Sequence, residues 1–218
     1  MGNVKLFSVD RSSYLMKGEK MKRPILYVNA CVRKESRTMR LAEKLLSKLD
    51  KPYEEVRLWE YAFPAVDEEY LNKRDLLISR GDFGNPMFDL ARRFAEAETI
   101  VIAAPFWDIS FPAALKQYLE QINVVGITFK YSKDGVPVGL CRANRLFYVT
   151  TAGGYYVPEE YGFGYIKALA QNYYGIQDVR QITAIGLDVD GADVGAIMRA
   201  AEDTIDTTLV SCDSCLKM

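Results

Sequence analysis

The residues best suited to chemistry form a short loop of aromatic and polar side chains: Pro105, Phe106, Trp107, Asp108 and Ile109. This loop follows the apolar run 99–102, which predicts a buried strand. It precedes Pro112, which predicts the start of a helix because proline is tolerated at the first helical position. Open α/β sheets bind ligands where a strand ends beside a helix N-terminus. Phe106 and Trp107 therefore predict apolar walls for a flat aromatic ligand.

A second candidate site, Ser36-Arg37-Thr38, follows the first predicted strand, 24–31, at the start of a predicted helix. Hydroxyl groups, free backbone N–H groups, the helix dipole and a guanidinium together form a small anion site. An ordinary serine N-cap beside a solvated arginine explains the same residues. Taken alone, the triplet favours that simpler interpretation.

A third candidate loop, made of Thr151, Ala152, Gly153 and Gly154, follows the predicted strand 145–151. Its glycines let the backbone approach a planar ligand closely. The three loops follow the first, third and fourth predicted strands, so they lie at one edge of a parallel sheet. A phosphate pocket beside a slot for a flat heterocycle is typical of FMN bound where the strand order of a flavodoxin-like sheet reverses.

The elements that position these loops alternate along the chain. Apolar or alternating segments predict strands at 24–31, 53–59, 99–104, 145–151 and 181–187. Helices are predicted at 36–49, 67–79, 87–94, 113–122, 165–174 and 192–209. This pattern predicts an α/β fold: a flavodoxin-like, doubly wound, five-stranded parallel sheet in the order 2-1-3-4-5, with helices on both faces. Residues 127–131, followed by a turn at 133–135, predict a small β-hairpin insertion.

One domain is expected over residues 22–210, because no repeat or linker interrupts this stretch. Residues 1–21 are expected to be a flexible extension, and residues 211–218 a C-terminal tail. The tail holds Cys212 and Cys215, a lone Cys-x-x-Cys pair without the further ligands that zinc needs. We therefore predict no metal site.

Composition excludes several classes of function. The formal net charge of −1 gives no general attraction to nucleic acid or to an acidic membrane. No apolar run approaches the roughly 20 residues that span a bilayer, and the first residues lack the apolar segment of a signal peptide, so cytoplasm is the expected compartment. The chain has no histidine, which excludes His-dependent triads and His-ligated metals. If the protein is an enzyme, an organic cofactor is the simplest agent for its chemistry.

Four segments together resemble a known family. They are Ser36-Arg37-Thr38, the stretch 104–116, the stretch 150–154 and the hairpin segment 126–131. They are similar to those of the FMN-dependent NADH azoreductases and NAD(P)H:quinone oxidoreductases of flavodoxin-like fold. The resemblance covers roughly residues 22–209, judged by the order and spacing of the elements. The proline-rich loop with its Leu115-Lys116 ending is the most specific of these motifs.

The resemblance implies a homodimer with one FMN per subunit near the interface. It implies reduction of quinones or azo compounds by ping-pong hydride transfer from NADH or NADPH, with the flavin rather than a side chain carrying the chemistry. The FMN phosphate would be bound by Ser36, Arg37 and Thr38. The flavin edge would lie against Pro105, Phe106, Trp107, Asp108 and Ile109, and its pyrimidine ring against Thr151, Ala152, Gly153 and Gly154.

The sequence departs from the family at a few positions. The family often has serine where Ala30 stands and commonly has asparagine where Asp108 stands. It often has Ser-Arg-Gly-Gly where residues 151–154 read Thr-Ala-Gly-Gly. A carboxylate at Asp108 would disfavour an anionic reduced flavin and lower its potential.

Two other functions stay open from the sequence: a flavodoxin-type electron carrier and a cofactor-free, flavodoxin-like regulatory module. The near-neutral charge and the hairpin insertion weigh against the carrier, whereas Ala30 and Asp108 favour the module.

Aromatic residues also crowd the segments beside the predicted site, which favours a homodimer interface over a purely internal role. They are Phe111, Tyr118, Phe129, Tyr131, Tyr155, Tyr156, Tyr161, Phe163 and Tyr165.

Overall fold

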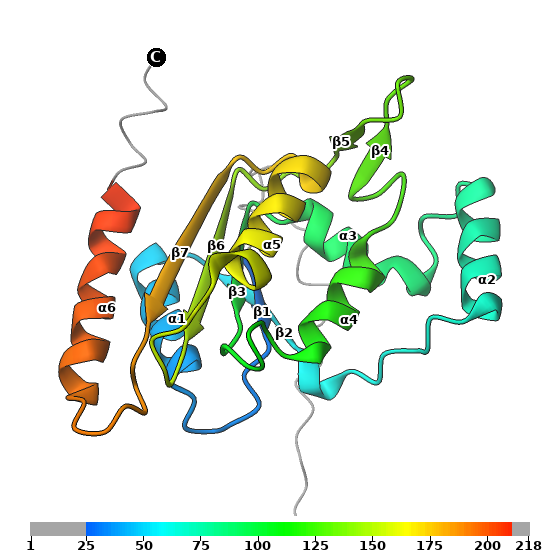
Figure 1. The fold of residues 1–218 in the computed structure, drawn as a ribbon. Helices are drawn as coiled ribbons and strands as arrows, with labels where there is room; N and C mark the ends of the chain where they lie inside the picture. Colours follow the sequence, from blue (N-terminus) through cyan, green and yellow to red (C-terminus); the bar gives the residue numbers. More distant parts are fainter. Residues whose placement is uncertain (1–24, 211–218) are drawn as a thin grey trace, which may run out of the picture.

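The computed structural model describes residues 25–210, in which a parallel sheet lies between two layers of helices (Figure 1). In chain order the elements are β1 (Ile25–Asn29), α1 (Arg37–Leu49), β2 (Tyr53–Arg57), α2 (Glu68–Ser79), α3 (Asp89–Glu96), β3 (Thr99–Ala103), α4 (Ala113–Ile122), β4 (Phe129–Tyr131), β5 (Pro137–Gly139), β6 (Arg145–Thr151), α5 (Phe163–Leu169), β7 (Asp178–Ala184) and α6 (Val194–Val210). Short 3-10 helices cover Leu58–Glu60, Pro86–Phe88 and Glu159–Tyr161, and a π-helix covers Ala170–Tyr174.

The sheet has the order β2-β1-β3-β6-β7, and every neighbouring pair is parallel. This confirms the predicted order, because β4 and β5 form the separate antiparallel hairpin that the sequence predicted. Every residue of β1 and β3 is buried, and β6 is buried beyond its first residue. Such continuous apolar strands are typical of a sheet that helices cover on both faces.

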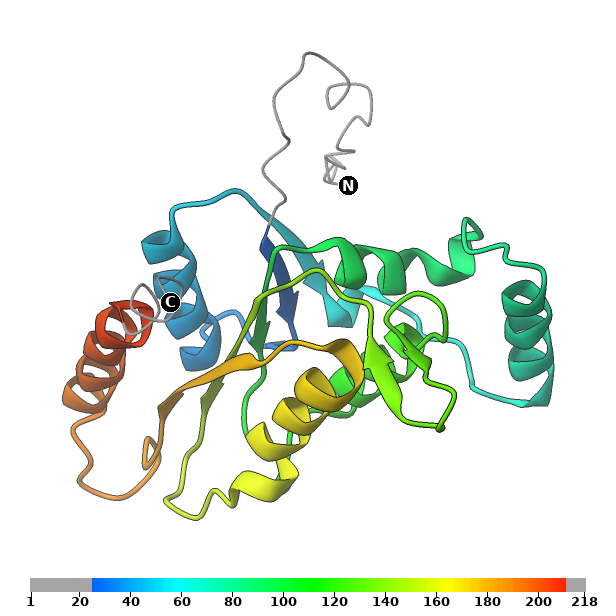
Figure 2. The same cartoon turned by 90° about the horizontal axis from the view of Figure 1, so that it is seen from above.

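Two apolar cores flank the sheet. On one face, Leu41 of α1 and Ile205 of α6 pack against the strands. On the other, Phe94 of α3, Tyr118 of α4 and Ile166 of α5 do the same. Figure 2 shows the two sets of helices on opposite sides of the sheet. The predicted doubly wound arrangement is therefore confirmed.

Helix α2 stands apart from these layers, at the opposite end of the molecule from α6 (Figures 1 and 2). It begins after Asp67, whose side chain caps it by accepting the Tyr70 backbone N–H at 2.8 Å. Leu77 and Ile78 pack partly against the core, and the Tyr70 hydroxyl donates to Gln121 Oε1 at 2.5 Å. The excursion is thus attached mainly at one side, leaving much of the helix exposed.

The last strand differs most from its prediction: it covers Asp178–Ala184 rather than 181–187. Its first residues are polar, so the sequence did not predict them as part of a strand. In the structure, Asp178 and Arg180 form an ion-pair network with Arg145 of the neighbouring strand. Its end comes early because the chain turns at Gly186, which has a left-handed φ of +78°. The predicted strand therefore extended into a loop.

Other boundaries move by one to three residues. The first strand ends at Asn29 rather than at Cys31, because the Asn29 side chain accepts the Cys31 backbone N–H and turns the chain. The predicted strands 53–59 and 99–104 end at Arg57 and Ala103. The helices predicted at 87–94, 165–174 and 192–209 instead begin at Asp89, Phe163 and Val194.

The predicted extension 1–21 and tail 211–218, with Cys212 and Cys215, lie outside the described residues. Between residues 25 and 210, no helix combines the length and the apolar character that crossing a membrane requires.

Candidate functional site

A cavity of about 290 Å³ opens at the carboxyl edge of the sheet, where β1, β3 and β6 end. All three predicted loops contribute to its lining. The predicted residues that line it are Ser36, Arg37, Thr38, Pro105, Phe106, Trp107, Thr151, Ala152 and Gly153. The expectation that these loops meet at one sheet edge is therefore confirmed.

The N-terminus of α1 forms one wall of this cavity. Ser36 is the N-cap of the helix, and its hydroxyl accepts the Met39 backbone N–H at 3.2 Å. Thr38 is buried in the first turn, and its Oγ1 lies 2.6 Å from Oγ1 of Thr151 at the end of β6. The wall thus combines hydroxyl groups with the positive end of a helix dipole, which favours an anion.

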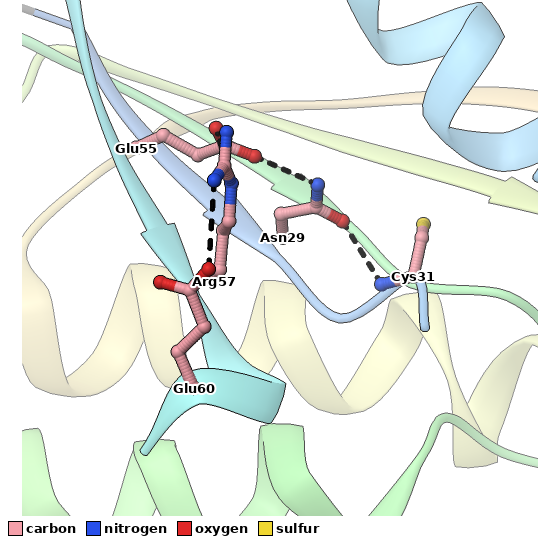
Figure 3. Close-up of polar contacts among 5 residues, drawn as sticks. All are labelled: Asn29, Cys31, Glu55, Arg57 and Glu60. Carbon is pink, nitrogen blue, oxygen red and sulfur yellow. Dashed lines mark hydrogen bonds and ion pairs between the residues drawn. The ribbon is translucent and has the colours of Figure 1, made fainter. Parts of the chain in front are cut away.

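A polar network at the end of β1 fixes the start of the loop that follows it (Figure 3). Asn29 is fully buried, and its Oδ1 accepts the Cys31 backbone N–H at 2.9 Å. Its Nδ2 donates to Glu55 Oε1 at 2.9 Å, and Arg57 in turn donates to Glu55 Oε2 at 2.9 Å. Arg57 also reaches Glu60 at 3.5 Å. The only sign of this network in the sequence is a polar residue inside an apolar strand, so the network was not predicted.

Cys31 follows this network and lines the cavity. Burial raises the pKa of its thiol to about 11, and the hydrogen bond with Ser36 opposes that effect only in part. The thiol is therefore neutral near pH 7 and does not serve as a thiolate nucleophile. Ala30, just before it, packs in the core on the α3–α5 face and is not part of the cavity lining.

The loop after β7 adds two lining residues that sequence analysis missed, Leu187 and Asp188. Arg37 Nη1 lies 2.7 Å from Asp188 Oδ1 and 3.3 Å from the Leu187 carbonyl oxygen. The signal for them was present, since every parallel strand ends at this edge of the sheet. The misplaced end of the fifth predicted strand concealed it.

Gly153 lies directly against Asp188. A Cβ atom at Gly153 would come within 2.4 Å of Asp188 Oδ2. At Gly154, by contrast, an added Cβ atom would meet no atom within 4 Å, and this residue does not line the cavity. The close approach expected of the glycine pair therefore belongs to Gly153.

Asp108 and Ile109 form a tight turn outside this cavity. Trp107 and Ser110 exchange both backbone hydrogen bonds, at 2.9 and 2.8 Å, and the two residues between them have φ values of +50° and +67°. Positive φ at both central positions is the requirement of a type I′ turn. The turn borders an apolar groove of about 630 Å³ that also includes Phe111, Tyr161 and Tyr165.

Comparison with known proteins agrees with this architecture. The family model of the flavodoxin-like fold matches residues 23–209. An azoreductase from Bacillus anthracis strain Sterne has the same fold, with a TM-score of 0.73 at 21% identity over 85% of this chain and 97% of that chain. An FMN-dependent NADH-azoreductase from Bacillus anthracis strain Ames Ancestor, solved with FMN, has a TM-score of 0.71 at 23% identity over 85% and 96%.

Curated sequences give a narrower relationship. The FMN-dependent NADH:quinone oxidoreductase of Clostridium beijerinckii is 34% identical over 190 residues, which cover 82% of this chain and 94% of that protein. FMN-dependent NADH:quinone oxidoreductase 2 of Clostridium acetobutylicum is 35% identical over 187 residues, covering 80% and 92%. The chain therefore belongs to the flavodoxin-like fold family and, within it, to the family of FMN-dependent NADH:quinone oxidoreductases.

Proposed function

We propose that the chain binds FMN in the cavity at the carboxyl edge of the sheet and uses it to oxidise NADH with a quinone acceptor. The observation that carries this proposal is the convergence of the α1 N-terminus and the two loops after β3 and β6 on one cavity. A phosphate site and a slot for a flat ring are thereby joined in a single space, as a flavin mononucleotide requires.

The residues present fit FMN. Ser36, Arg37 and Thr38 would hold the phosphate, because they combine hydroxyls and a guanidinium with the backbone N–H groups of α1. The ring would lie between the loop Pro105–Trp107 and the loop Thr151–Gly153, which both line the cavity. FMN, when bound, supplies two-electron redox chemistry by accepting a hydride and passing it on.

The protein's own contribution is binding, orientation and exclusion of competing groups. The neutral Cys31 thiol adds no charge to the cavity lining. Asp108 and Ile109, which follow the cavity-lining Trp107 in the chain, and Gly154 remain predicted flavin contacts. No side chain is assigned a covalent role, since the cofactor supplies the reacting atoms.

NADH and quinone are proposed as substrates because the curated relatives carry both in their names. Azo compounds are proposed as further acceptors, and NADH is proposed to be used in preference to NADPH. One site would serve the donor and the acceptor in turn, which is a ping-pong scheme. Cytoplasm is the proposed compartment, and the free thiols of Cys31 and Cys141 agree with a reducing environment.

A homodimer is part of the proposal. The groove beside the Asp108–Ile109 turn is largely apolar, and Ile109 and Tyr161 on it are 48% and 59% exposed. Lys116 and Glu160 add opposite charges to its lining, which suits a self-complementary surface of a twofold dimer. Tyr118 and Phe129, in contrast, are buried in the subunit itself and do not support an interface.

An absorbance spectrum of the purified protein tests the cofactor. Flavin bands that persist through gel filtration are expected, and a chain that takes up no FMN from a titration would be the cofactor-free module. Oxidation of NADH with a soluble quinone then separates an enzyme from an electron carrier. Parallel double-reciprocal plots are expected for a ping-pong scheme, and sedimentation equilibrium at micromolar protein measures the dimer.

A further inference from the structure

The cavity proposed for the FMN phosphate contains a carboxylate as well as cations. Asp188 Oδ1 lies 2.7 Å from Arg37 Nη1, and the side chains of both residues line the cavity. The two side chains are 41% (Arg37) and 68% (Asp188) exposed, so the pair stands at the solvent-facing mouth. Arg37 therefore already has an anionic partner before any phosphate binds.

The backbone fixes Asp188 in this position. Its N–H donates to the Gly153 carbonyl at 2.9 Å, and the Leu187 N–H donates to the Ala152 carbonyl at 3.2 Å. The Gly186 N–H reaches the Gly154 carbonyl at 3.1 Å. These bonds join the loop after β7 to the loop after β6. The loop that carries Asp188 is thus held at the cavity by the loop after β6, and its carboxylate pairs with Arg37 of α1.

The charges of the lining side chains cancel. Arg33 and Arg37 supply two positive charges, whereas Glu35 and Asp188 supply two negative ones. A phosphomonoester carries about −1.5 to −2 charges at pH 7. The helix N-terminus and the hydroxyls favour this dianion, but Asp188 repels it and competes for the Arg37 guanidinium.

We propose that Asp188 sets the affinity and the selectivity of the site for the flavin phosphate, by neutralising Arg37 in competition with it. The inference rests on the proposed function and adds a residue role to it. Removing the carboxylate frees Arg37 for the phosphate and removes a like charge from its surroundings. A flavin without a phosphate gains nothing from that change, so the effect belongs to FMN and not to riboflavin.

The test compares Asp188→Asn with the wild-type chain in fluorescence titrations of FMN and riboflavin. Asp188→Asn is expected to bind FMN about tenfold more tightly at low salt, as expected for removing one like charge a few ångströms from a dianion in water. Riboflavin affinity should not change. The gain should shrink in 0.5 M salt, because exposed charges are then screened over a few ångströms.

Asp190→Asn is the matched control. Asp190 is an exposed carboxylate in the same loop and does not line the cavity. Its variant changes the net charge equally and should leave both affinities unchanged. An equal gain in this variant would show a general charge effect and overturn the role of Asp188.

Other outcomes also decide the question. Weaker FMN binding by Asp188→Asn, or an equal change for both flavins, would show that Asp188 shapes the loop or binds the ribityl chain, and would overturn the proposal. If the wild-type chain binds neither flavin, the proposed function fails. In that case, FMN binding acquired by Asp188→Asn would still support the role of Asp188, and continued absence of binding would overturn both.

Discussion

Thr38 Oγ1 and Thr151 Oγ1 lie 2.6 Å apart in a buried hydroxyl pair that joins the first turn of α1 to the end of β6. The two residues are 113 positions apart in the chain and only 1% and 8% exposed. Each satisfies the other's polar atom where water has little access. The pair therefore fixes the distance between the predicted phosphate loop and the predicted ring loop before a ligand binds.

A double-mutant cycle on this pair should show strong coupling. Thr38→Val and Thr151→Val should each lower the free energy of unfolding by about 1–3 kcal/mol, because each leaves a buried hydroxyl without a partner. The double variant removes both hydroxyls, so it should lose less than the sum of the two. Urea denaturation measures all four proteins, and additive losses would show that the two hydroxyls act independently.

Ser36→Gly separates the folding role of Ser36 from its predicted ligand role. Glycine at an N-cap costs only a few tenths of a kcal/mol, so the stability of α1 should change little. FMN binding should weaken at least about tenfold, because a hydrogen bond to a charged group contributes about 1.5–3 kcal/mol. Fluorescence titration with FMN measures this. Asp67→Gly, at the N-cap of α2, is the control and should leave FMN affinity unchanged.

The two adjacent glycines should respond differently to alanine. The methyl group added by Gly153→Ala meets Asp188 Oδ2 at 2.4 Å and its Cβ at 3.1 Å, so the Asp188 side chain must rotate and its Cβ must shift by a few tenths of an ångström. We expect a loss of about 1–3 kcal/mol in the free energy of unfolding and weaker binding of both FMN and riboflavin. Gly154→Ala, with open space around it, should stay within about 0.5 kcal/mol. Equal effects at the two positions would contradict this assignment.

The sequence predicted the strands and helices best where their signals were strong and local. The apolar runs of β3 and β6, the Ser36 cap and the proline before α4 placed these elements within a residue of their positions. Because parallel strands end at a common edge, correct strands were enough to bring three distant loops to one cavity.

The remaining features depend on contacts that a local pattern does not encode. The prediction placed β7 three residues too late, because the strand's polar first half is stabilised by ion pairs with β6. As a result, the loop that carries Asp188 was not recognised as part of the site. The difference between Gly153 and Gly154 depends on which of them faces that loop. The positive φ of Ile109 runs against the preference of a β-branched residue, so propensity alone would predict another conformation there.

Stability should fall in acid partly through Asp178. Burial raises the pKa of its carboxyl, but hydrogen bonds from Arg180 and Arg145, at 2.6 and 2.7 Å, outweigh burial and lower the pKa below its usual value. A lowered pKa in the folded state stabilises the protein above the unfolded pKa, about 4, and this contribution is lost as the pH falls below it. Asp178→Asn should therefore be less stable than wild type at pH 7.

Urea denaturation between pH 7 and pH 3 measures this difference. The gap between wild type and Asp178→Asn should narrow as the pH falls through 4 towards the lowered pKa. Asp190→Asn changes the net charge equally without removing an ion pair among the described residues, so it reports the general charge effect. A gap between wild type and Asp178→Asn that stays constant over this range would show that the ion pairs contribute nothing.

Ile109→Gly should stabilise the subunit and weaken the proposed dimer. A left-handed conformation costs a non-glycine residue about 1–2 kcal/mol, and Ile109 holds φ +67° with 48% of its surface exposed. Glycine relieves this strain, and little buried apolar contact is lost within the subunit, so the free energy of unfolding should rise by about 1 kcal/mol at protein concentrations where the subunits are separate. The same change removes an apolar side chain from the groove, so sedimentation equilibrium should show a weaker dimer.

Val136→Gly is the matched control, because Val136 is 58% exposed but does not have a positive φ. Its variant should gain no stability and should leave the dimer unchanged. A loss of stability in Ile109→Gly like that of an ordinary exposed residue would show that the turn is unstrained, and an unchanged dimer would separate Ile109 from the interface.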